Sequence, residues 1–250
     1  LDPPGLDRAR ARRLVATVLA GQGGVALDPE TAAELLDCYG VRVWPTVRVR
    51  DEEEAVAAAE RLGWPVALKS TVAHLRHRID LGGVRLDVAG PAALREAYTQ
   101  MRRQLGPLAA GQPFEVQSMA RNGAACVIRS AEDPRFGPVL SFGIAGDAVD
   151  LLGDVMHAVA PLTDADVAEM VRGVRAAPRL FGYRGLPALD VAALEDVLGR
   201  VAVMADDLPE LRSLELHPVV VSEQGAAVLA ARVELGPAGR ADGARRALPQ

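Results

Sequence analysis

A single lysine, Lys69, stands among the 28 basic residues of this 250-residue chain, and the other 27 are arginines. Lysine carries a compact charge on a flexible stem, whereas arginine carries a wide planar fork, so the two are not interchangeable at a binding site. Lys69 ends the apolar run Trp64–Leu68, which predicts a buried strand. A lysine at the end of a strand suits phosphate binding. The alternative is a surface lysine left by chance.

A glycine pair, Gly82-Gly83, follows Lys69 after a short polar loop, with Asp80 just ahead of it. Backbone N–H groups in glycine-rich loops form concave sites that bind phosphate oxygens. The strand, the lysine and the glycine loop together predict a site for nucleotide phosphates.

His77 lies in the same loop, between Arg76 and Arg78. A neutral imidazole is a good nucleophile near pH 7, and guanidinium groups neutralise phosphate charge, so these residue types are compatible with phosphate chemistry in the loop. The alternative is a solvated loop histidine. His74 precedes His77 by three residues, but the sequence places no third ligand nearby, so we expect no metal site there.

The composition places the chain among α/β proteins. Half of its residues are apolar but only 4% are aromatic, so alanine, valine and leucine must build the core. The net charge of −5 disfavours broad binding to nucleic acid or to anionic membranes. Cys38 and Cys126 lack metal-ligand spacing and are expected to be free thiols in a reducing cytoplasm. Because the chain begins with leucine, we expect it to be a piece of a longer protein.

Helical and strand patterns alternate over the first 105 residues and predict a small α/β unit. A short strand over 41–44 is expected to end at Pro45. From Phe114 onwards, successive strand patterns predict an antiparallel sheet that ends in a hairpin over 214–233. The expected organisation is a helical lead-in over 1–27, a first lobe over 28–110, a second lobe over 111–235 and a disordered tail over 236–250.

Eight segments of the chain resemble, in order, the ATP-grasp domain of NDP-forming acyl-CoA synthetases, such as the β subunit of ADP-forming acetate–CoA ligase. They read LLDCYGVRVWPT, AVAAAERLGWPVALKS, HRIDLGGVRLDV, EVQSM, EDPRFGPVLSFGIAG, DVMHAVAPL, GYRG and LRSLELHPVVV. In some actinobacterial proteins such a module is fused to a GNAT-type acetyltransferase. The arginine-rich composition is compatible with a fragment of such a fusion.

The resemblance implies an α/β ATP-grasp fold with two α/β lobes and a nucleotide cleft between them. Lys69 would hold the phosphates of ATP or ADP, and the loop at Gly82 and Gly83 would close over them. His77 would carry a phosphoryl group between the acyl-phosphate side and ADP.

The strand formed by Gln117, Ser118 and Met119 would be the hinge next to adenine, by the same resemblance. The implied partners are CoA-binding and acyl-phosphate-forming domains, on this chain or another, and a GNAT domain if the fusion exists. No nucleic-acid or membrane partner is expected.

The metal positions depart from the family pattern. Mg²⁺ prefers hard oxygen ligands in octahedral geometry. His217 stands where the family has an asparagine, and Ala230 stands where it has an aspartate. Asp150 and Glu215 are the carboxylates that remain as candidate metal ligands.

Three further positions lack the expected charge. Ala125, Gly153 and Ala158 stand where the family has a glutamate, a lysine and an arginine. Phosphoryl transfer depends on positioning and on charge neutralisation, so these changes predict a damaged or repurposed ATP site that binds nucleotide weakly.

Three functions follow from these observations. The first is a degenerate ATP-grasp module that acts as a regulatory or structural domain of a larger protein. The second is an active ADP-forming acyl-CoA ligase subunit with a phosphohistidine relay, in which Asp150 and Glu215 bind Mg²⁺. The third, a carboxylate–amine ligase, is disfavoured because the HRIDLGGV loop resembles only the acyl-CoA synthetase branch.

Overall fold

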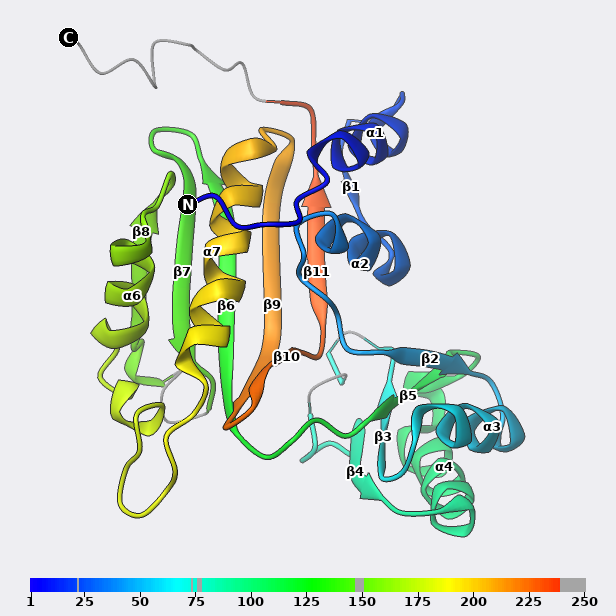
Figure 1. The fold of residues 1–250 in the computed structure, drawn as a ribbon. Helices are drawn as coiled ribbons and strands as arrows, with labels where there is room; N and C mark the ends of the chain where they lie inside the picture. Colours follow the sequence, from blue (N-terminus) through cyan, green and yellow to red (C-terminus); the bar gives the residue numbers. More distant parts are fainter. Residues whose placement is uncertain (22, 73, 76–77, 147–150, 239–250) are drawn as a thin grey trace, which may run out of the picture. The chain divides into compact units, whose positions relative to one another are not determined.

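The computed structural model describes residues 1–21, 23–72, 74–75, 78–146 and 151–238, which fold into two compact units (Figure 1). The smaller unit is Trp44–Ala120, and the larger one combines Leu1–Val43 with the residues from Arg121 onwards. This division differs from the lobes expected over 28–110 and 111–235. The N-terminal residues join the larger unit because β1 pairs with β11 and α2 packs into the same core.

The larger unit is built on an antiparallel sheet with the strand order β1-β11-β9-β6-β7-β8, and β10 pairs with β9. Its strands are β1 (Val25–Ala26), β6 (Ala124–Asp133), β7 (Gly137–Ile144), β8 (Val155–Val159), β9 (Leu211–Ser222), β10 (Gly225–Val228) and β11 (Ala231–Leu235). Its helices are α1 (Arg8–Leu19), α2 (Pro29–Asp37), α6 (Asp164–Gly173), α7 (Val191–Asp207) and the 3-10 turn η2 (Ala177–Arg179).

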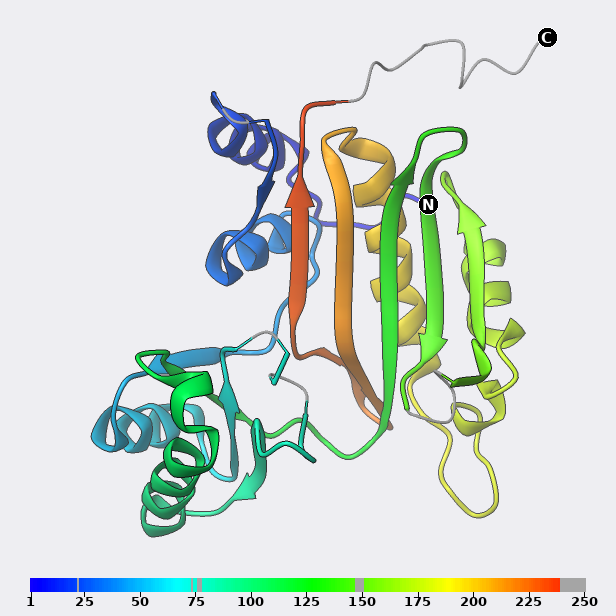
Figure 2. The ribbon, with the colours of Figure 1, turned by 180° about the vertical axis from the view of Figure 1, so that it is seen from behind.

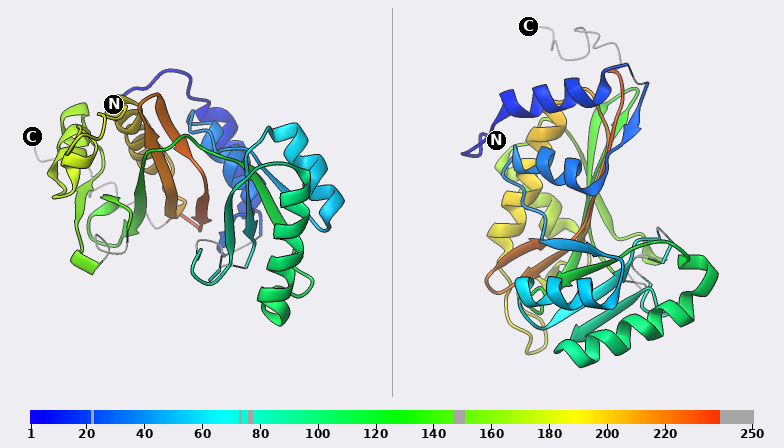
Figure 3. Two further views of the ribbon diagram at one scale, coloured as in Figure 1. Left: turned by 90° about the horizontal axis from the view of Figure 1, so that it is seen from below. Right: turned by 90° about the vertical axis from the view of Figure 1, so that its right-hand side faces the viewer.

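The larger sheet has one covered face and one bare face. Side chains alternate between the two faces of a strand. In β6, Cys126 and Ile128 belong to the core under the helices, so Arg129 points to the opposite face. Helices α2, α6 and α7 cover the core face. Figure 2 shows the opposite face, over which none of the described helices of this unit lies, and Figure 3 shows the structure from two further sides.

The predicted hairpin over 214–233 is present, with one break. β10 pairs with Val219–Ser222 and β11 with the first half of β9, so both strands run along the same long partner. Leu229 and Ala230 separate them, opposite the cis peptide bond between His217 and Pro218. Because proline has no N–H to donate, the regular ladder is interrupted at this point.

The smaller unit is a four-stranded antiparallel sheet with the order β2-β5-β3-β4 and two helices packed on one face (Figure 1). Its strands are β2 (Thr46–Val49), β3 (Val66–Ser70), β4 (Val84–Val88) and β5 (Phe114–Ser118). Its helices are α3 (Glu52–Leu62), α4 (Pro91–Leu105) and the 3-10 turn η1 (Gly106–Ala109). The core under the helices includes Leu68, Phe114 and Val116.

The strand expected over 41–44 is absent, which corrects the sequence interpretation. Within this segment only Val43 forms a bridge, to Val228, and β2 begins at Thr46. The chain passes from the larger unit to the smaller one between Val43 and Trp44, so this stretch has no continuous strand to pair with. Among the described residues, no helix is long and apolar enough to cross a membrane.

Candidate functional site

Lys69 lies near the end of β3 and is only 8% exposed. Because Leu68 packs into the core, alternation along the strand directs Lys69 to the face of the sheet away from α3 and α4. Its Nζ donates to Oε1 of Gln117 at 2.5 Å. In the register of the sheet, Lys69 is opposite Glu115, so the two residues are neighbours on the same face.

Gln117 anchors Lys69 to the neighbouring strands. Its amide nitrogen donates to Thr46 Oγ1 at 2.8 Å and to the Trp44 carbonyl oxygen at 3.2 Å. Since Gln117 is 2% exposed and its amide oxygen accepts from Lys69, both ends of the amide group are used within the protein. Gln117 is therefore a positioning residue for Lys69, and its predicted contact with adenine stays a prediction.

The other two hinge positions are also engaged. Ser118 accepts a hydrogen bond from the Trp44 indole Nε1, at 2.9 Å to Oγ and 3.0 Å to the carbonyl oxygen. The backbone N–H of Met119 donates to the Pro65 carbonyl oxygen at 3.2 Å. These bonds fix the end of β5 against β3 and the start of β2.

Sequence reasoning missed a second pair on this face. Glu115 is 2% exposed, and Arg48 Nε lies 3.6 Å from its Oε1. Arg48, Glu115 and Lys69 lie side by side on three neighbouring strands. The alternation of polar and apolar residues in Phe114–Ser118 was the signal that could have revealed Glu115.

The structure gives a steric reason why residues 82 and 83 are both glycine. A Cβ on Gly83 would lie 1.9 Å from the Leu75 carbonyl oxygen, and Gly82 has a φ of +76°. The two N–H groups donate within the loop, Gly82 to the Ile79 carbonyl and Gly83 to the Arg78 carbonyl. In this conformation they are not available as phosphate donors, so their predicted contact with phosphates remains a prediction.

Two predicted site residues, His77 and Asp150, lie outside the described residues. Arg78 lies within them, and its guanidinium is bonded to Asp80 at 2.8 and 2.5 Å. This bond lowers the pKa of the Asp80 carboxyl. His74 lies in the turn before the glycine pair.

Glu215 lies on the bare face of the larger sheet, between two arginines. Arg129 Nε on β6 donates to its Oε2 at 2.7 Å, and Arg232 on β11 lies 3.9 Å from its Oε1. Burial raises the pKa of Glu215, but the hydrogen bond from Arg129 and the surrounding positive charges outweigh burial, so the pKa is lowered overall. Glu215 is therefore ionised and already paired.

The described residues do not fit a magnesium site. Where the structure describes the chain, no group of three histidine, cysteine, aspartate or glutamate residues could hold a metal ion. Ala230 is 8% exposed and has no ligand atom in its side chain. The backbone N–H of His217 donates to the Ala230 carbonyl at 3.1 Å, and Glu215 accepts a hydrogen bond from Arg129 with Arg232 3.9 Å away.

The three other changed positions do not share one face. Ala125 lies between Ala124 and Cys126, which belong to the core, so it points to the bare face. Ala158 packs against the core, opposite Leu140 on β7, and therefore points to the helix side. Gly153 lies in an exposed turn before β8.

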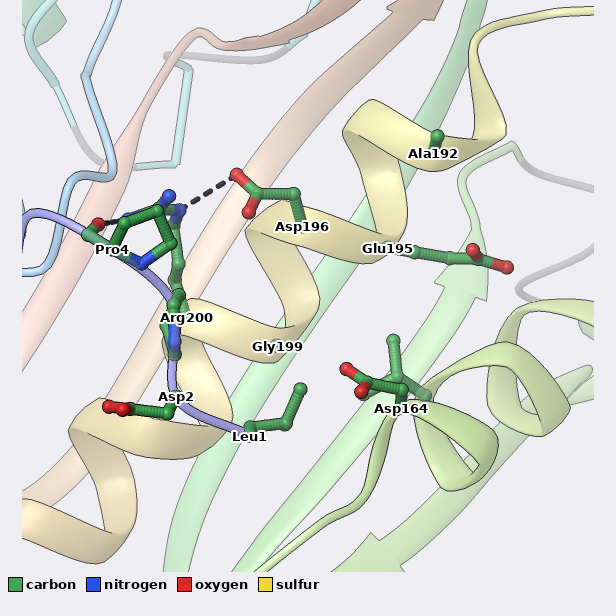
Figure 4. A pocket seen from close by; sticks show the side chains of 11 residues that line it. Leu1, Asp2, Pro4, Asp164, Ala192, Glu195, Asp196, Gly199 and Arg200 are labelled. Atoms are coloured by element: carbon green, nitrogen blue, oxygen red, sulfur yellow. Dashed lines mark hydrogen bonds and ion pairs between the residues drawn. The ribbon is translucent and has the colours of Figure 1, made fainter.

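A pocket of about 360 Å³ lies elsewhere in the larger unit, between the N-terminal residues, α6 and α7 (Figure 4). Arg200 holds its wall together through bonds to Asp196 at 2.7 Å and to the Pro4 carbonyl at 3.2 Å. Its lining is acidic, since it includes Asp164 and Glu195, and it contains none of the predicted site residues. This lining disfavours phosphate.

Comparison with known proteins identifies the fold. The model of the ATP-grasp domain family matches residues 18–235. The chain belongs to the ATP-grasp family. This confirms the fold expected from the eight matching segments.

The relatives are ADP-forming acyl-CoA synthetases. Subunit beta of acetate–CoA ligase (ADP-forming) I from Pyrococcus furiosus is 33% identical over 234 residues, which cover 92% of this chain and 100% of the relative. The dinucleotide-forming acetyl-coenzyme A synthetase 1 of Ca. Korarchaeum cryptofilum has been solved with coenzyme A and Ca-AMPCP. That structure is 30% identical, with a TM-score of 0.77 over 91% of this chain and 99% of the other.

A second structure of the Korarchaeum protein contains Mg-AMPPCP, and its phosphohistidine segment points towards the nucleotide-binding site. It is 30% identical to this chain, with a TM-score of 0.72 over 90% of this chain and 99% of the other. This ATP-grasp domain is therefore closely related to ADP-forming acyl-CoA synthetase subunits. The acetyltransferase fusion finds no support in these comparisons.

Proposed function

We propose that this ATP-grasp domain binds ATP or ADP weakly, as a module of a larger acyl-CoA synthetase-like protein, and transfers phosphate poorly or not at all. The proposal is carried by a contrast between the face of the smaller sheet that holds Lys69 and the expected metal positions on the larger sheet. Lys69 is kept, buried and held by Gln117 on the smaller sheet. The expected metal positions hold His217, Ala230 and a Glu215 already paired with arginine.

Retention of Lys69 supports nucleotide binding. A buried ammonium with a fixed partner is ordered before a ligand arrives, so less conformational entropy is lost on binding. The Korarchaeum relative, which is 30% identical to this chain, was solved with nucleotide analogues. The nucleotide cleft expected between the two lobes stays a prediction.

Loss of metal ligands supports poor transfer. The Korarchaeum relative holds its analogues together with Ca or Mg. In phosphoryl transfer, metal ions neutralise the charge that develops on the phosphates. The described residues of this chain form no group of three metal-ligating side chains.

Active ligase chemistry is the second candidate, and a specific observation favours it. The Korarchaeum relative has a phosphohistidine segment, and the resemblance places His77 in the corresponding loop. The Pyrococcus relative is called a β subunit, and that name implies another subunit beside it. If this chain is active, such a partner must bind CoA and form the acyl phosphate.

Titration calorimetry tests nucleotide binding directly. We expect heat on adding ATP or ADP at about millimolar concentration, and we expect Lys69→Gln to weaken binding about tenfold or more, the effect of losing one charged hydrogen bond. Lys69→Arg is the matched variant: it keeps the charge but changes its shape, and it should restore binding only in part. Wild-type protein without heat or thermal shift would contradict nucleotide binding.

Radiolabelled ATP separates the two candidates. With Mg²⁺ and a partner CoA-binding subunit from a relative, we expect little or no alkali-stable, acid-labile label on this chain. Label that is abolished by His77→Ala and retained by His74→Ala would establish the active ligase instead.

A further inference from the structure

Polar side chains form a row across the bare face of the larger sheet. The strand register places Arg232, Glu215 and Arg129 opposite one another on β11, β9 and β6. Ser141 on β7 continues the row beside Arg129. Because neighbouring strands lie about 4.8 Å apart, the Cα atoms of the two arginines are about 10 Å apart, with the glutamate between them.

This row carries an excess of positive charge. Two guanidinium groups, which remain protonated at all physiological pH values, face one carboxylate. The side chains of Arg129 and Arg232 are 47% and 54% exposed, whereas that of Glu215 is 28% exposed. The carboxylate is therefore the more enclosed group, and the guanidinium groups face solvent.

The two arginines have donors to spare for a ligand. Each guanidinium carries five N–H donors. The hydrogen bond from Arg129 to Glu215 uses its Nε, and the Arg232 contact at 3.9 Å is longer than a hydrogen bond. An exposed ion pair contributes little to folding stability, so stability alone does not explain why two arginines flank one glutamate. Glu215 instead holds the guanidinium groups in place.

We propose that Arg129 and Arg232 form a phosphate-binding pair and take the charge-neutralising role that the divalent metal has in nucleotide complexes. The proposal rests on the proposed function for the identity of the ligand, a nucleotide. Guanidinium groups bind phosphate oxygens through pairs of parallel hydrogen bonds. The same charges repel a divalent cation, which agrees with the lack of a metal-ligand cluster among the described residues.

The sign of the magnesium effect follows from this charge. Free ATP carries more negative charge than its magnesium complex, so a site with a net positive charge and no free carboxylate prefers the free form. A site with carboxylate ligands for the metal prefers the complex. We therefore expect saturating Mg²⁺ to leave the affinity for ATP unchanged or to lower it.

The test is calorimetry of the full chain with ATP and with inorganic tripolyphosphate, each in EDTA and in excess Mg²⁺. Arg129→Gln and Arg232→Gln should each weaken tripolyphosphate binding in EDTA about tenfold. Arg10→Gln is the matched control, because Arg10 is 41% exposed and bonded to Glu34 at 2.8 Å, and it should bind like the wild type. Arg129→Lys keeps the charge and should lose less affinity than Arg129→Gln.

Each result supports or overturns the proposed phosphate-binding role of Arg129 and Arg232. Wild-type binding by both glutamine variants, or an increase in ATP affinity beyond about twofold with Mg²⁺, overturns it. Tripolyphosphate binding that depends on both arginines supports the proposed phosphate-binding pair. If ATP binding then does not respond to Lys69→Gln, only the proposed nucleotide site at Lys69 is contradicted. Circular dichroism of each variant checks folding, and Arg232→Gln gives an independent answer if Arg129→Gln misfolds.

Discussion

Replacing Gln117 with leucine tests whether this amide holds Lys69. The substitution keeps a similar volume at a position that is 2% exposed, but it removes three hydrogen bonds. One joins the Lys69 ammonium to the amide oxygen, and the others run from the amide nitrogen to Thr46 Oγ1 and the Trp44 carbonyl. The ammonium stays buried with one acceptor fewer.

The size of the effect can be worked out from these bonds. A hydrogen bond to a charged group contributes about 1.5–3 kcal/mol, and a neutral one about 1 kcal/mol. Apolar packing of the leucine offsets part of the loss, so we expect Gln117→Leu to lower the free energy of unfolding by about 3 kcal/mol. Gln100→Leu, at an exposed position of α4 that bonds only to Glu96 in the described structure, should change it by less than about 0.5 kcal/mol.

Urea unfolding measures both variants, followed by tryptophan fluorescence because Trp44 and Trp64 both lie in the smaller unit. Calorimetry of the wild type shows whether the two units unfold in one transition, which decides how the midpoint converts to free energy. A Gln117→Leu midpoint equal to that of Gln100→Leu would refute the view that Gln117 positions Lys69. Gln117→Glu then offers a further check, since a carboxylate beside the ammonium should recover stability.

Three further predictions concern glycine substitution in the loop, the stability of the protein at acidic pH and the reactivity of a buried thiol. Gly83→Ala, measured by thermal unfolding, should destabilise the protein clearly more than Gly23→Ala, because a Cβ at 83 meets the Leu75 carbonyl whereas one at 23 meets nothing within 4 Å. Since the folded pKa of Glu215 is lowered, its pairing stabilises the protein above the unfolded pKa and is lost as pH falls through the folded pKa. Glu215→Gln should therefore flatten the acid limb of stability against pH. Burial raises the pKa of Cys126 to about 12, so Ellman's reagent at pH 8 should label it only after denaturant is added.

Local signals in the sequence predicted most of the elements. Asp28 and Pro29 begin α2, and Asp51 begins α3, where the carboxylates accept the first free N–H groups. The antiparallel sheet from Phe114 was predicted from successive strand patterns, but its first strand, Phe114–Ser118, belongs to the smaller sheet instead. The division into units could not be predicted in the same way, because it depends on β1 pairing with β11, more than 200 residues away in the chain.

The site was predictable where one residue type stands out. Lys69 was found because it is the sole lysine, and its strand was found because the run before it is apolar. Arg48 and Glu115 were not found, because they resemble ordinary strand surface residues until the register puts them beside Lys69. Arg129 was overlooked for the same reason, since only the pairing of β6 with β9 places it against Glu215.

The strand register also changes how the missing charged side chains at Ala125 and Ala158 are interpreted. Ala158 points to the helix-covered face, so the arginine expected there would not have shared the bare face with Glu215. Its loss says little about metal binding. Ala125 does point to the bare face, and the resemblance expects carboxylates at Ala125 and Ala230, whereas the described candidate ligand Glu215 contacts Arg129 and Arg232. Such a face can attract phosphate without oxygen ligands to orient a metal, so binding and transfer must be measured separately, because the first can persist where the second has failed.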